Sequence, residues 1–147
     1  MNDPAKPPSG KRGSGVRRRK SGQLERASLG TVLIVDDDPG MLATLERMVA
    51  RGGYDVVCMA SPQLALELSQ KERPTLVLSD MDMPAMSGRE LAEALRAAMG
   101  PSAPPVVILT GGDPTRAACP EVAAVAHKPV SMEALLEMLA AATSTST

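Results

Sequence analysis

The 147-residue sequence lacks Phe and Trp and has a single Tyr. The base stacking that single-strand nucleic-acid binders use is therefore largely unavailable. The core has to be built from Leu, Val, Ile, Ala and Met, of which there are ten. No run reaches the ~18 to 20 apolar residues of a membrane-spanning helix, and the N-terminus lacks the apolar stretch of a secretory signal. We expect a cytoplasmic protein with one folded domain.

Cysteine and histidine are also scarce. Cys58 and Cys119 are far apart in the sequence and form no CxxC pair, and His127 is the only histidine. This pattern argues against a zinc site. We expect both thiols to be reduced and to pack as small hydrophobic side chains. We expect His127 to be a solvated neighbour of Lys128.

The charge is divided unevenly, although the formal net charge is only −1. Residues 1–30 carry eight basic and two acidic side chains, a net +6, whereas residues 31–147 carry eight and fifteen, a net −7. The first segment is rich in Pro, Gly, Ser, Lys and Arg, and we expect it to be a disordered tail. Its basic stretch, 11–26, could contact nucleic acid non-specifically, an acidic membrane surface, an acidic partner or the acidic domain itself. A solubilising leader is the alternative.

Short apolar runs alternate with amphipathic stretches through residues 31–143. The runs are typical of strands buried in a parallel sheet, and they cover 32–35, 54–58, 75–79, 106–109 and 122–126. Helices are predicted from Pro39, from Pro62, over 88–99 and after Ser131. Only eleven residues, several of them Gly or Pro, separate Thr110 from the last run, so a fourth helix there would be shortened. The pattern predicts a doubly wound α/β domain with a five-stranded parallel sheet, followed by a short polar tail over 144–147.

Polar side chains follow four of the five predicted strands, where open α/β sheets carry their reactive crevice. They are Asp36 and Asp37, Asp80, Thr110, and the pair Lys128 and Pro129. Three converging carboxylates require a cation, and oxygen ligands favour Mg²⁺. A carboxylate beside Mg²⁺ is a competent nucleophile toward phosphorus, and a lysine and a hydroxyl can neutralise the transferred group. Asp80, at the end of the middle strand, is the best candidate for the nucleophile.

Four segments, VLIVDDDP, LVLSDMDMPAMSG, VVILTGG and AHKPV, resemble in order the signature segments of response-regulator receiver domains, the chemotaxis-regulator-like family. The resemblance runs from about Thr31 to Thr143 and implies a flavodoxin-like strand order of 2-1-3-4-5. It implies that Asp80 is the phosphoacceptor and that Thr110 and Lys128 contact the phosphoryl group. It also implies that Mg²⁺ is bound by Asp36, Asp37, Asp80 and the backbone carbonyl of Asp82. The bond before Pro129 is often cis in this family.

The resemblance implies a phosphorelay component rather than an enzyme with a separate substrate. A histidine kinase or phosphotransfer protein would phosphorylate Asp80, and an unknown downstream protein would bind the result. We expect a single-domain type, because few residues follow the last helix. The alternative is a phosphorylation-independent adaptor whose basic tail docks on nucleic acid, membrane or an acidic partner. A more distant alternative is a metal-dependent phosphatase with Asp82 as its general acid.

Three features depart from the family pattern. Val125 occupies the position where the family commonly has an aromatic switch residue, and the fourth helix is shortened. Gly111 and Gly112 leave the predicted site open, so water attack on a phosphoryl group should not be strongly blocked. Because the aromatic switch residue is missing and the fourth helix is shortened, we expect the domain to signal through another surface, such as the last helix. Asp38 matches no functional position and is expected to be solvated or to cap a helix.

Overall fold

The computed structural model describes residues 27–144, and the predictions for 1–26 and 145–147 lie outside this range. The strands are β1 (Thr31–Val35), β2 (Asp55–Met59), β3 (Leu76–Asp80), β4 (Val106–Thr110) and β5 (Ala124–His127). The α-helices are α1 (Pro39–Arg51), α2 (Pro62–Glu72), α3 (Gly88–Met99) and α4 (Met132–Ser144). Two single-turn 3₁₀ helices, η1 (Gly100–Ser102) and η2 (Pro114–Arg116), lie in the connections.

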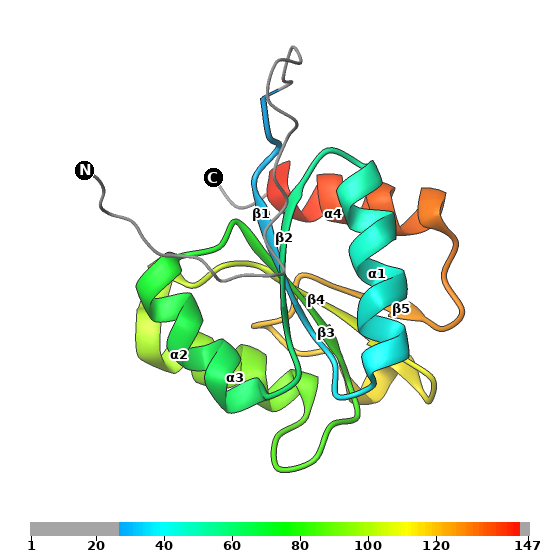
Figure 1. Ribbon diagram of the computed structural model, residues 1–147. Coiled ribbons are helices and arrows are strands. Elements are labelled where there is room, and N and C mark those ends of the chain that lie inside the picture. The colour runs from blue at the N-terminus through cyan, green and yellow to red at the C-terminus, as the bar shows by residue number, and fades with distance from the viewer. Residues whose placement is uncertain (1–26, 145–147) are drawn as a thin grey trace, which may run out of the picture.

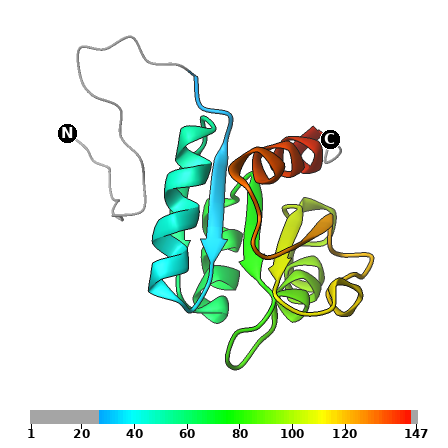
Figure 2. The same ribbon diagram turned by 90° about the vertical axis from the view of Figure 1, so that its right-hand side faces the viewer.

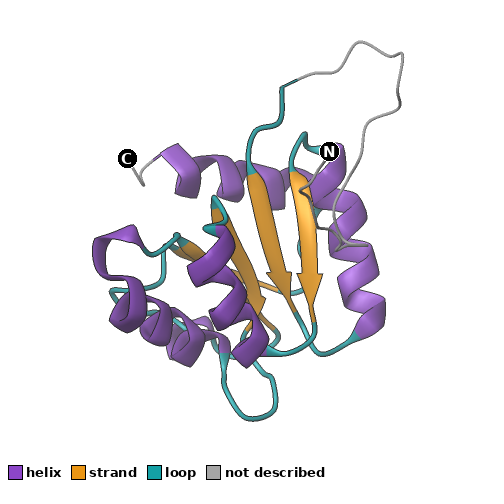
Figure 3. Ribbon diagram, turned by 60° about the vertical axis from the view of Figure 1, so that its left-hand side comes forward, coloured by secondary structure: helices purple, strands orange, loops and turns teal. Residues whose placement is uncertain are grey.

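All neighbouring strands are parallel, in the order β2-β1-β3-β4-β5. Helices α1 and α4 cover one face of the sheet, and α2 and α3 cover the other (Figure 1). The turned views in Figures 2 and 3 show the sheet as a layer between these helix pairs. The expected fold and strand order are confirmed.

The central strands β1, β3 and β4 are apolar on both sides because both of their faces are covered. Alternate residues of each strand point to opposite faces and join separate core clusters. Along β1, Val32 and Ile34 pack on the α1 and α4 side, whereas Leu33 and Val35 pack on the α2 and α3 side. These four side chains are at most 1% exposed.

Side-chain caps begin each helix close to the residue that the sequence indicates. Asp38 Oδ1 accepts a hydrogen bond from Gly40 N at 2.9 Å, which confirms Asp38 as the cap of α1. Ser61 Oγ accepts from Leu64 N at 3.2 Å, and Ser131 Oγ accepts from Ala134 N at 3.1 Å. These bonds satisfy N–H groups that have no partner within the helix.

The fourth helix is reduced to the single turn η2, as its Gly and Pro content indicates. The predicted start of the last strand is wrong by two residues. Val122 N donates to the carbonyl of Cys119 at 3.0 Å and closes a turn, so β5 begins at Ala124. β2 also lies one residue later than predicted, at Asp55–Met59. No helix within residues 27–144 is long and apolar enough to cross a membrane.

The contact between the start of α3 and the end of β3 depends on a glycine. A Cβ atom at Gly88 would lie 2.5 Å from the carbonyl oxygen of Asp80, whereas a Cβ at Gly40 would meet only Asp38 Oδ1 at 3.4 Å. We expect Gly88→Ala to lower the free energy of unfolding by about 1–3 kcal/mol, because β3 or α3 must shift. The matched substitution Gly40→Ala should be neutral or stabilising by up to ~1 kcal/mol, since Ala is the better helix former. Urea unfolding measures both, and equal effects would contradict the close packing at Gly88.

Candidate functional site

Three carboxylates meet at the carboxyl edge of the sheet. Asp36 and Asp37 follow β1, Asp80 ends the adjacent strand β3, and one oxygen from each lies within 4.8 Å of the others. Asp36 is 1% exposed and Asp80 8% exposed, whereas Asp37 is exposed. The structure therefore brings together the three aspartates whose convergence the strand pattern predicts.

Lys128 is the basic partner in this cluster. Its backbone N–H donates to the carbonyl of Thr110 at 2.8 Å, and the bond between Lys128 and Pro129 is cis. Its Nζ donates to Asp80 Oδ1 at 2.8 Å. Burial acts to lower the pKa of Lys128, but its hydrogen bond to Asp80 and the negative charges of Asp80, Asp36 and Asp38 outweigh burial and raise the pKa. The ammonium group is therefore held in its charged form.

The carboxylate of Asp36 is only partly hydrogen-bonded. Its Oδ1 accepts from Asp38 N at 2.9 Å, whereas its Oδ2 is buried and has no hydrogen-bond partner among the described residues. Burial raises the pKa of Asp36, and the charges of Asp80 and Asp37 add to the effect. The Asp38 N–H and Lys128 oppose it without cancelling it. Asp36 is thus a buried acceptor in an environment that disfavours its charge.

A divalent cation fits this donor set. Three carboxylates and one lysine leave two negative charges uncompensated when all four groups are ionised, and the unpaired Asp36 oxygen is a hard ligand of the kind that Mg²⁺ takes. Asp82 is exposed, and its carboxylate is not part of the three-carboxylate group. The backbone carbonyl of Asp82 stays a predicted ligand of Mg²⁺.

Thr110 ends β4, next to β3 and β5, and is 2% exposed. Its Oγ1 accepts from Gly112 N at 3.0 Å, and a hydroxyl that accepts one hydrogen bond can still donate its own proton. A Cβ at Gly111, the residue after Thr110, would meet no heavy atom within 4 Å apart from its chain neighbours, so the space around this residue is open. His127 is exposed on the neighbouring strand, in agreement with the solvated position expected for it.

The loop after Asp80 is fixed by backbone bonds and by one unusual conformation. Met81 N donates to the carbonyl of Leu109, and Gly88 N donates to the carbonyl of Met81, both at 2.9 Å. Ala85 has a φ of 73°, in the left-handed region that L residues seldom adopt. The methionines of the loop are partly buried against the α2 and α3 side of the core; they are Met81, Met83 and Met86.

Sequence reasoning missed Ser79. Its Oγ is buried and donates to the carbonyl of Asp80 at 2.8 Å, which helps to fix the backbone of the central aspartate. The one signal in the sequence is a serine in the otherwise apolar run LVLSD. Val125 is partly buried in the α2 and α3 side of the core, where it pairs in register with Ile108 of β4.

The family model of the response regulator receiver domain matches residues 32–140. The chain belongs to this family. The receiver is 36% identical over 113 residues to the transcriptional regulatory protein GlrR of Escherichia coli, covering 74% of this chain and 25% of GlrR. It is 40% identical over 80 residues to the DNA-binding response regulator MtrA of Mycolicibacterium smegmatis, covering 54% of this chain and 33% of MtrA. The chain thus spans about a quarter to a third of the length of such relatives.

Solved structures agree with this membership. The chemotaxis response regulator CheY4 of Vibrio cholerae superposes with a TM-score of 0.68 at 28% identity, covering 78% of this chain and 99% of CheY4. A sensor protein from Polaromonas sp. JS666 superposes with a TM-score of 0.74, covering 81% of this chain and 99% of that one, and at 23% identity it supports the fold alone. The chain is therefore a receiver domain of two-component response regulators, as its four sequence segments indicate.

Removing the charge of Asp36 should stabilise the metal-free receiver. Because the pKa of Asp36 is raised in the folded state, folding binds protons, and stability falls as the pH rises from the ordinary range of Asp through the raised value. We expect Asp36→Asn to raise the free energy of unfolding at pH 7 by on the order of 1 kcal/mol and to flatten this pH dependence. Urea unfolding in EDTA measures both quantities.

The matched control is Asp38→Asn in the same loop. Asn caps a helix as well as Asp does, so this variant should unfold like the wild type. A metal-free Asp36→Asn protein that is less stable than the wild type would contradict the charge imbalance.

Proposed function

We propose that this receiver accepts a phosphoryl group on Asp80 in a Mg²⁺-dependent reaction and transmits the change through protein contacts. The observation that carries the proposal is the 2.8 Å contact between Lys128 Nζ and Asp80 Oδ1 beside two further carboxylates. A structural ion pair alone would not need Asp36 and Asp37 next to it, because like charges raise the cost of burial. A site for a cation and a phosphoryl group does need them.

The proposed reaction transfers a phosphoryl group from a histidine nitrogen of the donor to a carboxylate oxygen of Asp80. A carboxylate oxygen of Asp80 attacks the phosphorus of a phosphohistidine, an O–P bond forms, the N–P bond breaks, and the departing imidazole takes up a proton. Asp36, Asp37, Asp80 and the backbone carbonyl of Asp82 would hold Mg²⁺, which when bound supplies positive charge to the phosphoryl oxygens. The donor would be a histidine kinase or a phosphotransfer protein.

Lys128 and Thr110 would hold the product. The Lys128 ammonium, now bonded to Asp80, would bind a phosphoryl oxygen instead. The Thr110 hydroxyl keeps Gly112 N as its donor and can give its own proton to another phosphoryl oxygen. These two shifts would bias the segments after β4 and β5, and α4 follows the second of them.

The receiver would occupy residues 31–143, between a basic tail over 1–30 and a polar end over 144–147, and a downstream protein would bind its phosphorylated form. Nothing in residues 27–144 favours the adaptor alternative, whose basic stretch, 11–26, lies outside that range.

Phosphorylation by a small-molecule donor tests the acceptor directly. Incubation of the full chain with acetyl phosphate and Mg²⁺ should add one phosphoryl mass in intact mass spectrometry. Asp80→Asn should add none, because the amide is not a nucleophile of this kind, and EDTA should suppress labelling of the wild type.

Asp82→Asn is the control, since only the backbone carbonyl of Asp82 is proposed to act. This variant should be labelled like the wild type. Full labelling of Asp80→Asn would exclude Asp80 as the acceptor, and loss of labelling in Asp82→Asn would show that the Asp82 side chain takes part, as in the phosphatase alternative.

The open side at Gly111 predicts a short-lived phosphoryl group. A side chain here meets no atom within 4 Å of its Cβ, so Gly111→Val should fold normally and shield the phosphorus from water. We expect the half-life of the phosphoryl group on Asp80 to be about threefold longer in Gly111→Val than in the wild type, which corresponds to a hydrolysis barrier higher by ~0.7 kcal/mol. Loss of label after removal of the donor measures the rate of hydrolysis. The rate in Gly111→Ala should lie between those of the wild type and Gly111→Val. An unchanged lifetime would mean that water reaches the phosphorus from another side.

A further inference from the structure

The peptide unit that follows Asp80 is hydrogen-bonded at both of its ends. Its carbonyl oxygen, which belongs to Asp80, accepts from Ser79 Oγ at 2.8 Å. Its N–H group, which belongs to Met81, donates to the carbonyl of Leu109 in β4 at 2.9 Å. Because a peptide unit is planar, two bonds of this kind fix the backbone rotation with which the chain leaves Asp80.

Ser79 lies on the face of the sheet that is turned away from the Asp80 carboxylate. Successive side chains of a strand point to opposite faces. Val77 packs on the α2 and α3 side of β3, whereas Leu78 packs on the α1 and α4 side. Ser79, two residues after Val77 and 1% exposed, therefore points toward α2 and α3, and Asp80 points to the other face. The hydroxyl can act on a reaction at the carboxylate only through the backbone.

The start of α3 packs directly on this pair of residues. A Cβ atom at Gly88 would lie 2.5 Å from the carbonyl oxygen of Asp80 and 3.2 Å from Ser79 Oγ. The loss of one hydroxyl oxygen at Ser79 opens less space than a water molecule needs. We therefore expect no water to replace the hydroxyl in Ser79→Ala.

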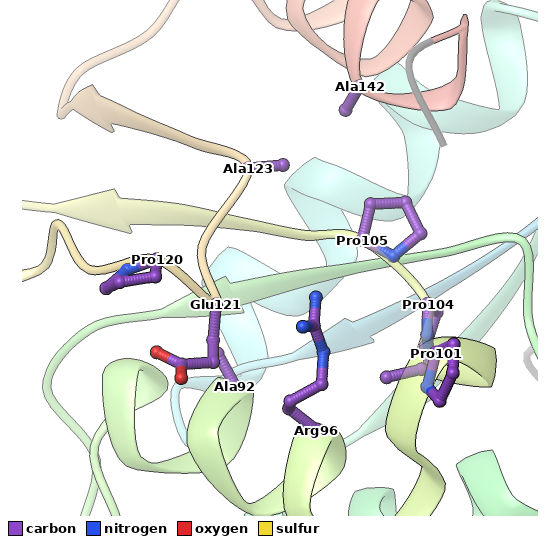
Figure 4. Close-up of a pocket in the computed structure, with 10 residues that line it drawn as sticks. Ala92, Arg96, Pro101, Pro104, Pro105, Pro120, Glu121, Ala123 and Ala142 are labelled. Carbon is purple, nitrogen blue, oxygen red and sulfur yellow. The ribbon is translucent and has the colours of Figure 1, made fainter. Parts of the chain in front are cut away.

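The other end of α3 belongs to a different part of the molecule. With Arg96 it lines a cavity of about 260 Å³ between α3, α4 and the segments that enter β4 and β5 (Figure 4). This cavity lies at the amino ends of the strands, the opposite edge of the sheet from Asp80. The contact of α3 with the phosphoryl site is therefore made at Gly88, at the start of the helix.

We propose that Ser79 is a positioning residue for phosphoryl transfer to Asp80. This inference rests on the proposed function. The bond from Ser79 fixes the direction in which the chain leaves β3, and with it the place of the Asp82 carbonyl, the predicted ligand of Mg²⁺, relative to the Asp80 carboxylate. Reactions that depend on positioning are sensitive to such changes, because a displacement of ~1 Å can cost on the order of a hundredfold in rate.

Burial of a serine is not sufficient for this role. The rest of β3 before Ser79 is apolar and fully buried, and a hydroxyl in such surroundings is costly unless it is hydrogen-bonded. Ser69 on α2 is also fully buried, but its Oγ has no hydrogen-bond partner among residues 27–144. The bond to the Asp80 carbonyl distinguishes Ser79 from Ser69, so Ser69→Ala is the matched control.

Amide hydrogen exchange of the full chain, in EDTA and without a phosphoryl donor, tests the bond itself. Exchange at Met81 should be about five- to tenfold faster in Ser79→Ala than in the wild type, when measured relative to the Val77 amide. The Val77 amide is the reference because it donates to the Pro105 carbonyl at 2.9 Å, at the far end of β3. Ser69→Ala should leave this ratio unchanged. An unchanged ratio in Ser79→Ala would show that the hydroxyl does not hold the peptide.

The rate of labelling by acetyl phosphate and Mg²⁺, at equal fractions of folded protein, tests the positioning role. Ser79→Ala should be labelled about fivefold more slowly than the wild type. The rate in Ser79→Cys should lie between the two, because a thiol is a weaker donor than a hydroxyl. Ser69→Ala should be labelled at the wild-type rate.

Two outcomes of this labelling experiment have different meanings. A wild-type labelling rate in both Ser79→Ala and Ser79→Cys would overturn the positioning role alone, even where urea unfolding shows lower stability, because Ser79 would then be only a structural residue. Absence of label from the wild type would contradict the proposed function and this inference with it.

Discussion

The excess of negative charge at the carboxyl edge of the sheet is the constraint on which the site depends. Three carboxylates share one lysine there, and the buried Oδ2 of Asp36 has no partner among residues 27–144. Burial makes this arrangement costly unless a cation and an anionic ligand complete it. The parallel strand order creates the cluster because β1 and β3 end side by side, and Gly88 lets α3 pack directly against the Asp80 carbonyl. The fold thus holds the carboxylates together.

The short connection between β4 and β5 shapes both ends of the receiver. At the carboxyl edge, Gly111 leaves space beside Thr110, and at the amino edge the last part of the connection forms one wall of the cavity that contains Arg96. Val125 is an aliphatic side chain packed in the core, so an aromatic switch cannot operate at that position. The short connection and the aliphatic Val125 are both consistent with a signalling surface that differs from the one that the family commonly uses.

Local sequence rules predicted most of the fold and the positions of the site residues. The capping role of Asp38, the bounds of α3 and the reduction of the fourth helix follow from short-range chemistry that a sequence displays. The start of β5 could not be predicted, because Val122 is apolar yet closes a turn with Cys119. The unpaired Asp36 oxygen and the cavity around Arg96 depend on contacts between distant segments, and no local pattern encodes them.

A calorimetric titration of Mg²⁺ into the metal-free receiver tests the charge imbalance most directly. We expect one Mg²⁺ per chain, weaker binding in Asp36→Asn, and tighter binding in Lys128→Met. The last change removes the only basic side chain of residues 27–144 that pairs with the cluster. Equal Mg²⁺ affinities in all three proteins would mean that these carboxylates do not form an incomplete cation site.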